Sequence, residues 1–174
     1  LVDNADGTGT LSGTPTNAEV GTHNVTLRVN DGTVDVDQSF TITVNPVNDA
    51  PVNSVPSAQS VDEDTTLTFN AANTNLISIS DVDAASSLVA VTLTATNGVL
   101  TLSGTTGLTI TAPSDGTDDA SMAFTGTITD INTALDGMIF TPTAGYNGAA
   151  SVQIVTSDEG NTGSGGALSD DDTL

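Results

Sequence analysis

Hydrophobic and polar residues alternate one by one along much of the chain, which is the periodicity of a half-buried β-strand. In HNVTLRVND, residues 23–31, Val and Leu fall on one side and Asn, Thr and Arg on the other. SFTITVN, residues 39–45, repeats the pattern with Phe, Ile and Val against Thr. Each segment therefore predicts a strand with one apolar and one polar face.

The same alternation predicts further strands near 67–70, 76–80, 108–111, 122–128, 138–142 and 151–157. LVAVTLTATNGVLTLSG, residues 88–104, predicts a hairpin, because Asn97-Gly98 between two alternating runs favours a type I′ turn. One short helix is predicted in DINTALDG, with Asp130 as its cap and Gly137 as its stop. Many short strands separated by turn residues indicate an all-β, antiparallel β-sandwich.

The sequence divides into two parts of unequal length. Residues 1–46 supply three or four strands, which is too little for an independent core and indicates a partial repeat. Residues 56–174 are long enough for a second, nearly complete sandwich. A further strand is predicted to begin in ALSDDDTL, residues 167–174, so both ends are interpreted as cut through a domain of a repeat array.

The charge and the cysteine content of the chain exclude several classes of function. The chain of 174 residues carries 22 acidic residues against one Lys or Arg, for a formal net charge of −21, and 19 of the acids are Asp. Asp favours turns over helices, so the acids are expected in loops that offer oxygen atoms. Without a basic patch, binding to nucleic acid or to an anionic membrane surface is excluded. The chain has no Cys, which excludes disulfides and thiolate metal sites, and no apolar run long enough to cross a membrane.

Residues 47–55 are predicted to be a linker between the two parts. The stretch NPVNDAPVNSVP, residues 45–56, contains three prolines, each of which fixes φ and removes a backbone donor. Proline also holds the preceding residue in an extended conformation. The joint is therefore expected to be stiff and extended, with Asn48 and Asp49 presenting side-chain oxygens between Pro46 and Pro51.

Several motifs resemble those of a known family. TGTLSGTPTNAEVGTHNVTLRVNDGTVDVDQSFTITVNPVNDAP is similar to the C-terminal part of the cadherin-like, dystroglycan-type repeats of large bacterial surface proteins. Residues 56–174, with VDEDTTLTF, ISISDVDA and FTPTAGYNGAASVQIVTSDEG, resemble the next tandem cadherin-like repeat of bacterial adhesins. The resemblance covers almost the whole chain and implies Greek-key, cadherin- or Ig-like sandwich repeats, the first of them partial.

The acidic motifs suggest a calcium site at the joint. Asp81-Val82-Asp83 places two carboxylates on the same side of an extended segment, and Ca²⁺ takes six to eight oxygen ligands. In cadherins an Asn-Asp linker shares calcium with an Asp-x-Asp motif about thirty residues later. The resemblance therefore implies that Asn48 and Asp49 bind Ca²⁺ together with Asp81 and Asp83, and that Asp158 in TSDEG faces the same joint. The alternative is that these residues only cap turns.

Three other acidic segments have separate interpretations. VDEDT resembles the N-terminal Glu segment of cadherin repeats, which implies that Glu63 and Asp64 bind Ca²⁺ at a following joint; the alternative is a solvated strand start. The acids at 170–172 are interpreted as a solvated loop. DNADGTGTL near the N-terminus fails as an EF-hand loop because Val2 and Gly13 stand where acidic ligands are needed, so an Asx turn is expected there.

The chain is not expected to be an enzyme. Cys and Lys are absent, no nucleophile elbow is present, and few aromatic residues are available to stack a sugar. The predicted function is a secreted or cell-surface spacer of a bacterial adhesin or matrix protein, stiffened by Ca²⁺ between neighbouring repeats of the same polypeptide. Two alternatives stay open: a subunit of an extracellular filament that other copies of the chain complete by strand addition, and a module that binds cell-surface glycans or proteins.

Overall fold

The computed structural model describes residues 1–174, apart from the side chain of Asp3. The chain folds into two compact units, Leu1–Val47 and Asn48–Leu174. Residues 48–55, for which the sequence predicted a linker, belong to the second unit and include strand β5.

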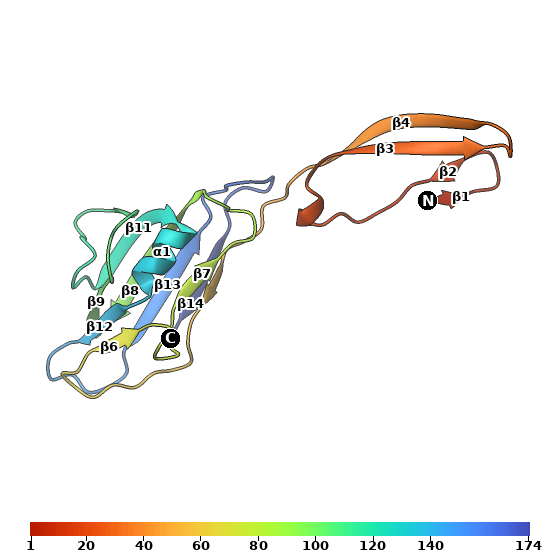
Figure 1. Ribbon diagram of the computed structural model, residues 1–174. Helices are drawn as coiled ribbons and strands as arrows, with labels where there is room; N and C mark the ends of the chain where they lie inside the picture. The colour runs from red at the N-terminus through yellow and green to blue at the C-terminus, as the bar shows by residue number, and fades with distance from the viewer. The chain divides into compact units, whose positions relative to one another are not determined.

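The second unit is an antiparallel β-sandwich (Figure 1). One sheet has five strands in the order β10-β11-β8-β13-β14, a second has three in the order β6-β12-β9, and β5 pairs with β7. The strands are β5 (Val52–Ser54), β6 (Leu67–Phe69), β7 (Ser78–Ser80), β8 (Leu88–Thr96), β9 (Gly98–Thr101), β10 (Thr109–Ile110), β11 (Ser121–Thr127), β12 (Met138–Pro142), β13 (Ser151–Ser157) and β14 (Ser169–Thr173). The predicted all-β, antiparallel sandwich is therefore confirmed.

The hydrophobic core of the second unit is built by the predicted alternation. In β8, β11 and β13 every second residue is buried, and the residues between them are exposed or half-buried. Helix α1 (Ile128–Leu135) connects β11 to β12 and adds three buried side chains. The largest fully buried side chains are Phe69, Phe124, Ile77, Leu93, Leu100, Met122, Ile131, Leu135, Met138, Ile154, Val89 and Val91.

The helix begins earlier than the sequence predicted. Thr127 is the N-cap, and its hydroxyl accepts a hydrogen bond from the Asp130 N–H at 3.2 Å. Asp130 instead lies in the first turn, where its carboxylate accepts a hydrogen bond from that same hydroxyl. Its negative charge there interacts favourably with the positive end of the helix dipole. The assignment of Asp130 as the cap was wrong by three residues, whereas Gly137 follows the C-cap with a φ of +101° as expected for a stop.

The predicted hairpin at Asn97-Gly98 is also wrong. β8 belongs to the five-stranded sheet and β9 to the three-stranded sheet, so the chain crosses between sheets at this corner. Asn97 has the expected positive φ of 57°, but Gly98 is not among the positive-φ residues that a type I′ turn requires. Gly98 is needed for another reason: a Cβ there would lie 2.4 Å from the ring of Phe140.

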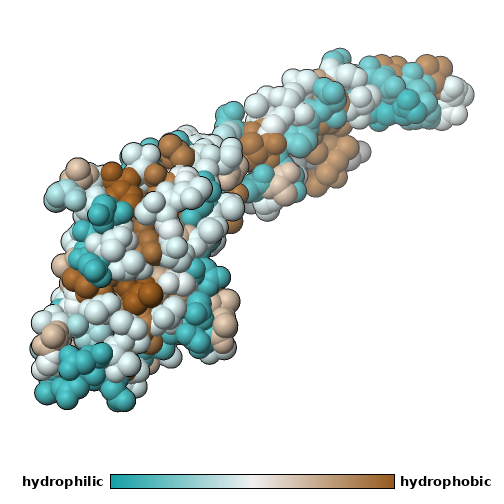
Figure 2. All heavy atoms as spheres, turned by 60° about the vertical axis from the view of Figure 1, so that its left-hand side comes forward, coloured by the Kyte–Doolittle hydropathy of each residue, from teal (hydrophilic) through white to brown (hydrophobic). Residues whose placement is uncertain are grey.

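The first unit contains two strand pairs. They are formed by β1 (Val2–Asp3) with β2 (Gly9–Thr10) and by β3 (Gly21–Asn30) with β4 (Asp35–Val44), with a short 3-10 helix at Asn17–Glu19. The register pairs Val25 with Phe40, and Asn24 with Thr41, so one face of the β3–β4 ribbon is apolar and the other polar. Among the described side chains of this unit none is buried; Phe40 is 38% exposed, and apolar surface is visible along the unit in Figure 2.

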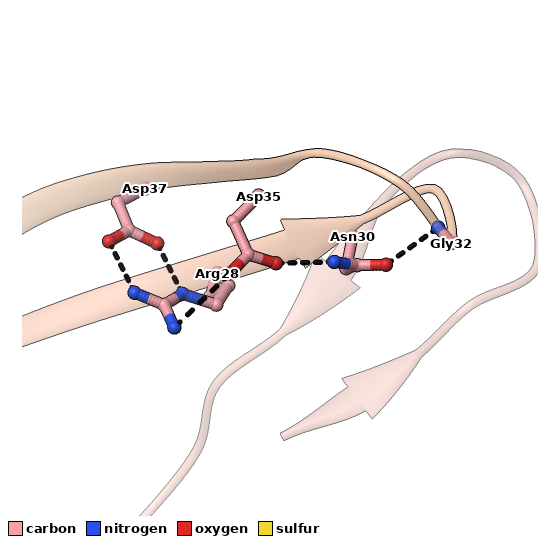
Figure 3. Close-up of polar contacts among 5 residues, drawn as sticks. All are labelled: Arg28, Asn30, Gly32, Asp35 and Asp37. Atoms are coloured by element: carbon pink, nitrogen blue, oxygen red, sulfur yellow. Dashed lines mark hydrogen bonds and ion pairs between the residues drawn. The ribbon is translucent and has the colours of Figure 1, made fainter.

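The polar face of this ribbon holds the single basic side chain of the protein (Figure 3). Arg28 lies opposite Asp37 and donates two hydrogen bonds to its carboxylate, at 2.7 and 2.8 Å, with Asp35 at 3.4 Å. The hydrogen bond with Asp37 raises the pKa of Arg28, and the same bond lowers the pKa of Asp37. Since Arg28 is the only Lys or Arg, the second unit contains no basic side chain of its own.

The loop before β2 closes as an Asx turn. The Asp6 carboxylate accepts hydrogen bonds from the N–H of Thr8 at 3.0 Å and from its hydroxyl at 2.6 Å. The sequence-based rejection of an EF-hand loop in favour of an Asx turn is therefore confirmed.

Candidate metal centre

The pairing of β5 with β7 brings the two acidic motifs together. Val52 pairs with Ser80 in antiparallel register. Continuing that register by three residues places Asp49 opposite Asp83, although they are 34 positions apart in the sequence. The Asp49 N–H donates a hydrogen bond of 3.1 Å to Asp83 Oδ2, which closes the ladder at its acidic end.

Helix α1 fixes the strand that carries the Asp-x-Asp motif. Asn132 accepts a hydrogen bond from the Ile79 N–H at 2.8 Å, and its amide donates one to the Ile79 carbonyl at 2.9 Å. The side chain thus imitates a neighbouring strand on the free edge of β7. Asp81 and Asp83 follow directly after that strand, so the helix and β5 together set their position.

Asp81 folds the motif into a turn. Its Oδ1 accepts hydrogen bonds from the N–H of Asp83 at 3.0 Å and from the N–H of Ala84 at 3.1 Å. This is the turn-capping role that the sequence allowed as an alternative to metal binding. It engages only one oxygen of the carboxylate.

Asn48 and Asp158 form the buried side of the cluster. Asn48 is 6% exposed, and its amide nitrogen donates to Asp158 Oδ2 at 2.5 Å and to the Gly166 carbonyl at 2.9 Å. Asp158 is fully buried, and its Oδ1 accepts hydrogen bonds of 2.8 Å from the N–H groups of Gly160 and Leu168. Asp158 is therefore joined to the cluster through Asn48 and has donors on both oxygens; its role as a metal ligand stays a prediction.

Three buried oxygen atoms of this cluster accept no hydrogen bond from any described residue: Asn48 Oδ1, Asp81 Oδ2 and Asp83 Oδ1. Such buried acceptors without a donor are rare in folded proteins and costly in free energy. All three belong to residues that the sequence nominated as calcium ligands.

The cluster is not a site built from carboxylates alone. Within the described residues, no group of three or more His, Cys, Asp or Glu side chains is arranged to hold a metal ion. The unsatisfied set is instead two carboxylates and one amide. Ca²⁺ accepts amide and backbone carbonyl oxygens as well as carboxylates, and completes its shell with water, so this donor set fits Ca²⁺ better than a softer metal.

The electrostatic environments of Asp83 and Asp158 differ. Burial raises the pKa of the Asp83 carboxyl, and the neighbouring Asp81 and Asp49 carboxylates raise it further, against the lowering effect of the Asp49 N–H. For Asp158, burial alone would raise the pKa. However, the hydrogen bonds from Gly160, Leu168 and Asn48 outweigh burial and lower it. Asp158 is thus stabilised as an anion by the fold, whereas ionised Asp83 has one backbone donor and no basic side chain in its unit to pair with.

Glu63 and Asp64 lie elsewhere. Asp64 Oδ1 accepts a hydrogen bond of 2.8 Å from the Gly145 N–H, next to the corner where the Thr143 N–H binds the Asn97 carbonyl. That corner follows the last residue of β8, whereas the cluster of Asn48, Asp81, Asp83 and Asp158 lies near the first residue of β8 (Figure 1). The two sets of acids therefore occupy opposite ends of the sandwich, and the structure does not bring Glu63 or Asp64 to the cluster.

Sequence reasoning missed the loop between β13 and β14, residues 158–168. Thr162 donates its hydroxyl hydrogen bond to the Asp83 carbonyl, and the Ser164 carbonyl accepts one of 3.0 Å from the Asn48 N–H. The four glycines of this loop indicate flexibility but not its contacts, because most of those contacts use backbone atoms.

The prediction that the acids at 170–172 form a solvated loop was wrong. They lie on strand β14, where Asp170 Oδ2 accepts a hydrogen bond of 2.7 Å from the Asn53 N–H.

The second unit is an antiparallel β-sandwich with an oxygen-rich cluster at one end. In the first unit, residues 5–45 match the model of the He_PIG family, described as "Putative Ig domain". No curated protein and no solved structure matches the chain. The match supports an Ig-like fold, whereas the cadherin-like repeat assignment stays a prediction.

An Ig-like domain suggests an extracellular module, and Ig-like folds are typically not enzymes. None of the helices in the described chain has the length and apolarity needed to span a bilayer.

Proposed function

We propose that the protein is a structural module of an extracellular adhesin or matrix protein, similar to tandem cadherin-like repeats, in which Ca²⁺ stiffens the start of the second unit. Asn48, Asp81 and Asp83 would hold the ion through side-chain oxygens, with Asp49 beside them. Bound Ca²⁺ would fix residues 48–51 against the end of β7. Because Asn48 directly follows the first unit in sequence, this would limit the freedom of the joint.

The observation that carries the proposal is the set of three buried, unsatisfied oxygens on residues from two distant parts of the chain. Turn capping alone explains Asp81 Oδ1, which has two N–H donors, but it leaves the other oxygen of Asp81 and one oxygen each of Asn48 and Asp83 without a donor. A divalent cation would satisfy all three and neutralise two carboxylates at once.

The effect of Asp83→Asn on the stability of the folded protein should change sign when calcium is added. The pKa of Asp83 is raised in the folded state, so without metal the folded protein prefers the protonated carboxyl, and stability is lost as the pH rises from the ordinary value of about 3.9 through the folded pKa. In EDTA at pH 7, Asp83→Asn should therefore unfold at a higher urea concentration than the wild type. In 5–10 mM CaCl₂, roughly ten times the weak limit for extracellular calcium modules, the order should reverse.

Asp136→Asn is the matched control for this experiment. Asp136 is an exposed carboxylate in the same unit whose Oδ1 accepts one backbone hydrogen bond, from Ala71 at 3.3 Å. Its substitution should have similar effects in EDTA and in CaCl₂. If Asp83→Asn destabilises the protein equally under both conditions, Asp83 is a structural cap and the proposal is wrong.

A second candidate function, assembly into a filament, is favoured by one observation. The apolar face of the β3–β4 ribbon is only partly covered within the first unit. Residues 11–19 lie against it and Val25 is half-buried, but Phe40 and Ile42 are 38% and 39% exposed. A second copy could cover the exposed part. Light scattering over a hundredfold range of protein concentration separates the candidates: the spacer predicts a constant monomer mass, and the filament predicts a mass that rises with concentration.

A further inference from the structure

The loop between β13 and β14 contacts the candidate metal centre on two sides. On one side, Asn48 is held by the carbonyls of Ser164 and Gly166, at 3.0 and 2.9 Å. On the other, the Thr162 hydroxyl binds the backbone carbonyl of Asp83. The loop therefore bridges the Asn48 and Asp83 halves of the cluster, and neither contact uses an oxygen that the proposed ion would need.

The two ends of the loop are fixed independently of Asn48 and Asp83: Asp158 Oδ1 binds the N–H groups of Gly160 and Leu168, and the Asn161 amide donates to the Leu88 carbonyl at 2.8 Å. Between these points, residues 162–166 are held by the contacts with Asn48 and Asp83. The glycines of the loop at 160, 163, 165 and 166 give little conformational restraint. Glu159 and Thr162 adopt positive φ values of 59° and 63°, which are unfavourable for residues with a Cβ and above all for the β-branched Thr. A conformation of this kind persists only where the surroundings impose it.

We infer that residues 159–167 form a calcium-dependent strap: the loop closes on the site when Ca²⁺ holds Asn48 and Asp83 together, and opens when the ion is removed. The inference rests on the proposed function. Without the ion, the Asp81 and Asp83 carboxylates repel one another and draw water to their unsatisfied oxygens. The two anchor points of the strap then move apart, and the positive-φ residues relax.

Glu159 is already exposed, but the backbone around its peptide bond to Gly160 is held in a folded loop. Opening of the strap would loosen this segment and let a protease bind it in an extended conformation. The chain has only three Glu residues, Glu19, Glu63 and Glu159, so a glutamyl endopeptidase gives few fragments, each identified by its mass. Glu19 lies in the first unit and Glu63 at the opposite end of the second, so both serve as internal references in the same digest.

The experiment is limited digestion of the whole chain at 20 °C in 5 mM CaCl₂ and in EDTA, with calcium binding measured by calorimetry on the same preparation. We expect cleavage at Glu159 to be at least tenfold faster in EDTA, with the rates at Glu19 and Glu63 changed less than twofold. Thr162→Val, which keeps the shape of the side chain but removes its hydroxyl, should give rapid cleavage at Glu159 in calcium too. Glu159→Gln should abolish the fragment and confirm its origin.

The outcomes separate the two proposals. If calcium binds but does not change the Glu159 rate, the strap is wrong and the metal site stands. If all three sites are accelerated equally in EDTA, calcium acts on global unfolding and the strap is again wrong. If calorimetry detects no binding, the proposed function itself fails.

Discussion

Millimolar CaCl₂ should raise the melting temperature of the second unit by about 10 °C relative to EDTA. A ligand that binds only the folded state stabilises by RT ln(1 + [L]/Kd), about 2.7 kcal/mol at a hundredfold excess over Kd. For a domain of this size, that corresponds to a shift of roughly 10 °C. The measurement is thermal unfolding followed by far-UV circular dichroism, because the chain has no Trp.

Three controls make this result specific. MgCl₂ should give a much smaller shift, because Mg²⁺ requires a tight octahedral shell and gives up water reluctantly. The double variant Asp81→Ala, Asp83→Ala should keep its β-sheet signal but lose the calcium response. Asp64→Asn, at the opposite end of the sandwich, should keep the response. Identical melting curves in calcium and in EDTA for the wild type would exclude a calcium site.

Truncation of a single core aromatic residue should cost even more. Phe69 is fully buried between the sheets, and Phe69→Ala should lower the free energy of unfolding by about 3–5 kcal/mol. Phe40→Ala makes the same chemical change on the apolar face of β4, where the ring is 38% exposed, and should cost about 1 kcal/mol or less. Urea denaturation followed by circular dichroism measures both.

This pair of variants also tests what covers the ribbon of the first unit. A large cost for Phe40→Ala at high protein concentration that disappears on dilution would show that a second copy buries the ring. Such a result would favour the filament over the spacer.

The sequence predicted the strands well where alternation was long and uninterrupted. The predicted bounds of β12 and β13, 138–142 and 151–157, agree with the structure, and the buried positions of β8 are those expected from its alternation. Local sequence signals did not predict which sheet a strand joins where contacts with distant residues determine it. Asn97-Gly98 marks a change of chain direction, but whether the next strand joins the same sheet depends on Phe140, which is 42 residues away from Gly98.

The side chains of the candidate site were predicted from the sequence, whereas its backbone contacts were not. Side chains with a recognisable spacing, such as Asp81 and Asp83, could be nominated from the sequence. The strap could not, because it holds Asn48 through the backbone carbonyls of Ser164 and Gly166, and any residue can supply a carbonyl. Asp158 was predicted to be a ligand, but no sequence pattern indicates the three hydrogen bonds that bind its carboxylate.

The direction of β14 has a mechanical consequence. This strand begins beside the candidate metal centre, where Ser169 pairs with Ser157, and runs to the other end of the sheet, where Leu174 and Val152 exchange hydrogen bonds. A tensile load applied between Asn48 and Leu174 therefore acts along the strands, and the hydrogen bonds between β13 and β14 must break together in shear instead of one after another. Forced unfolding is governed by the unfolding rate, so this geometry should slow the unfolding of the second unit under load.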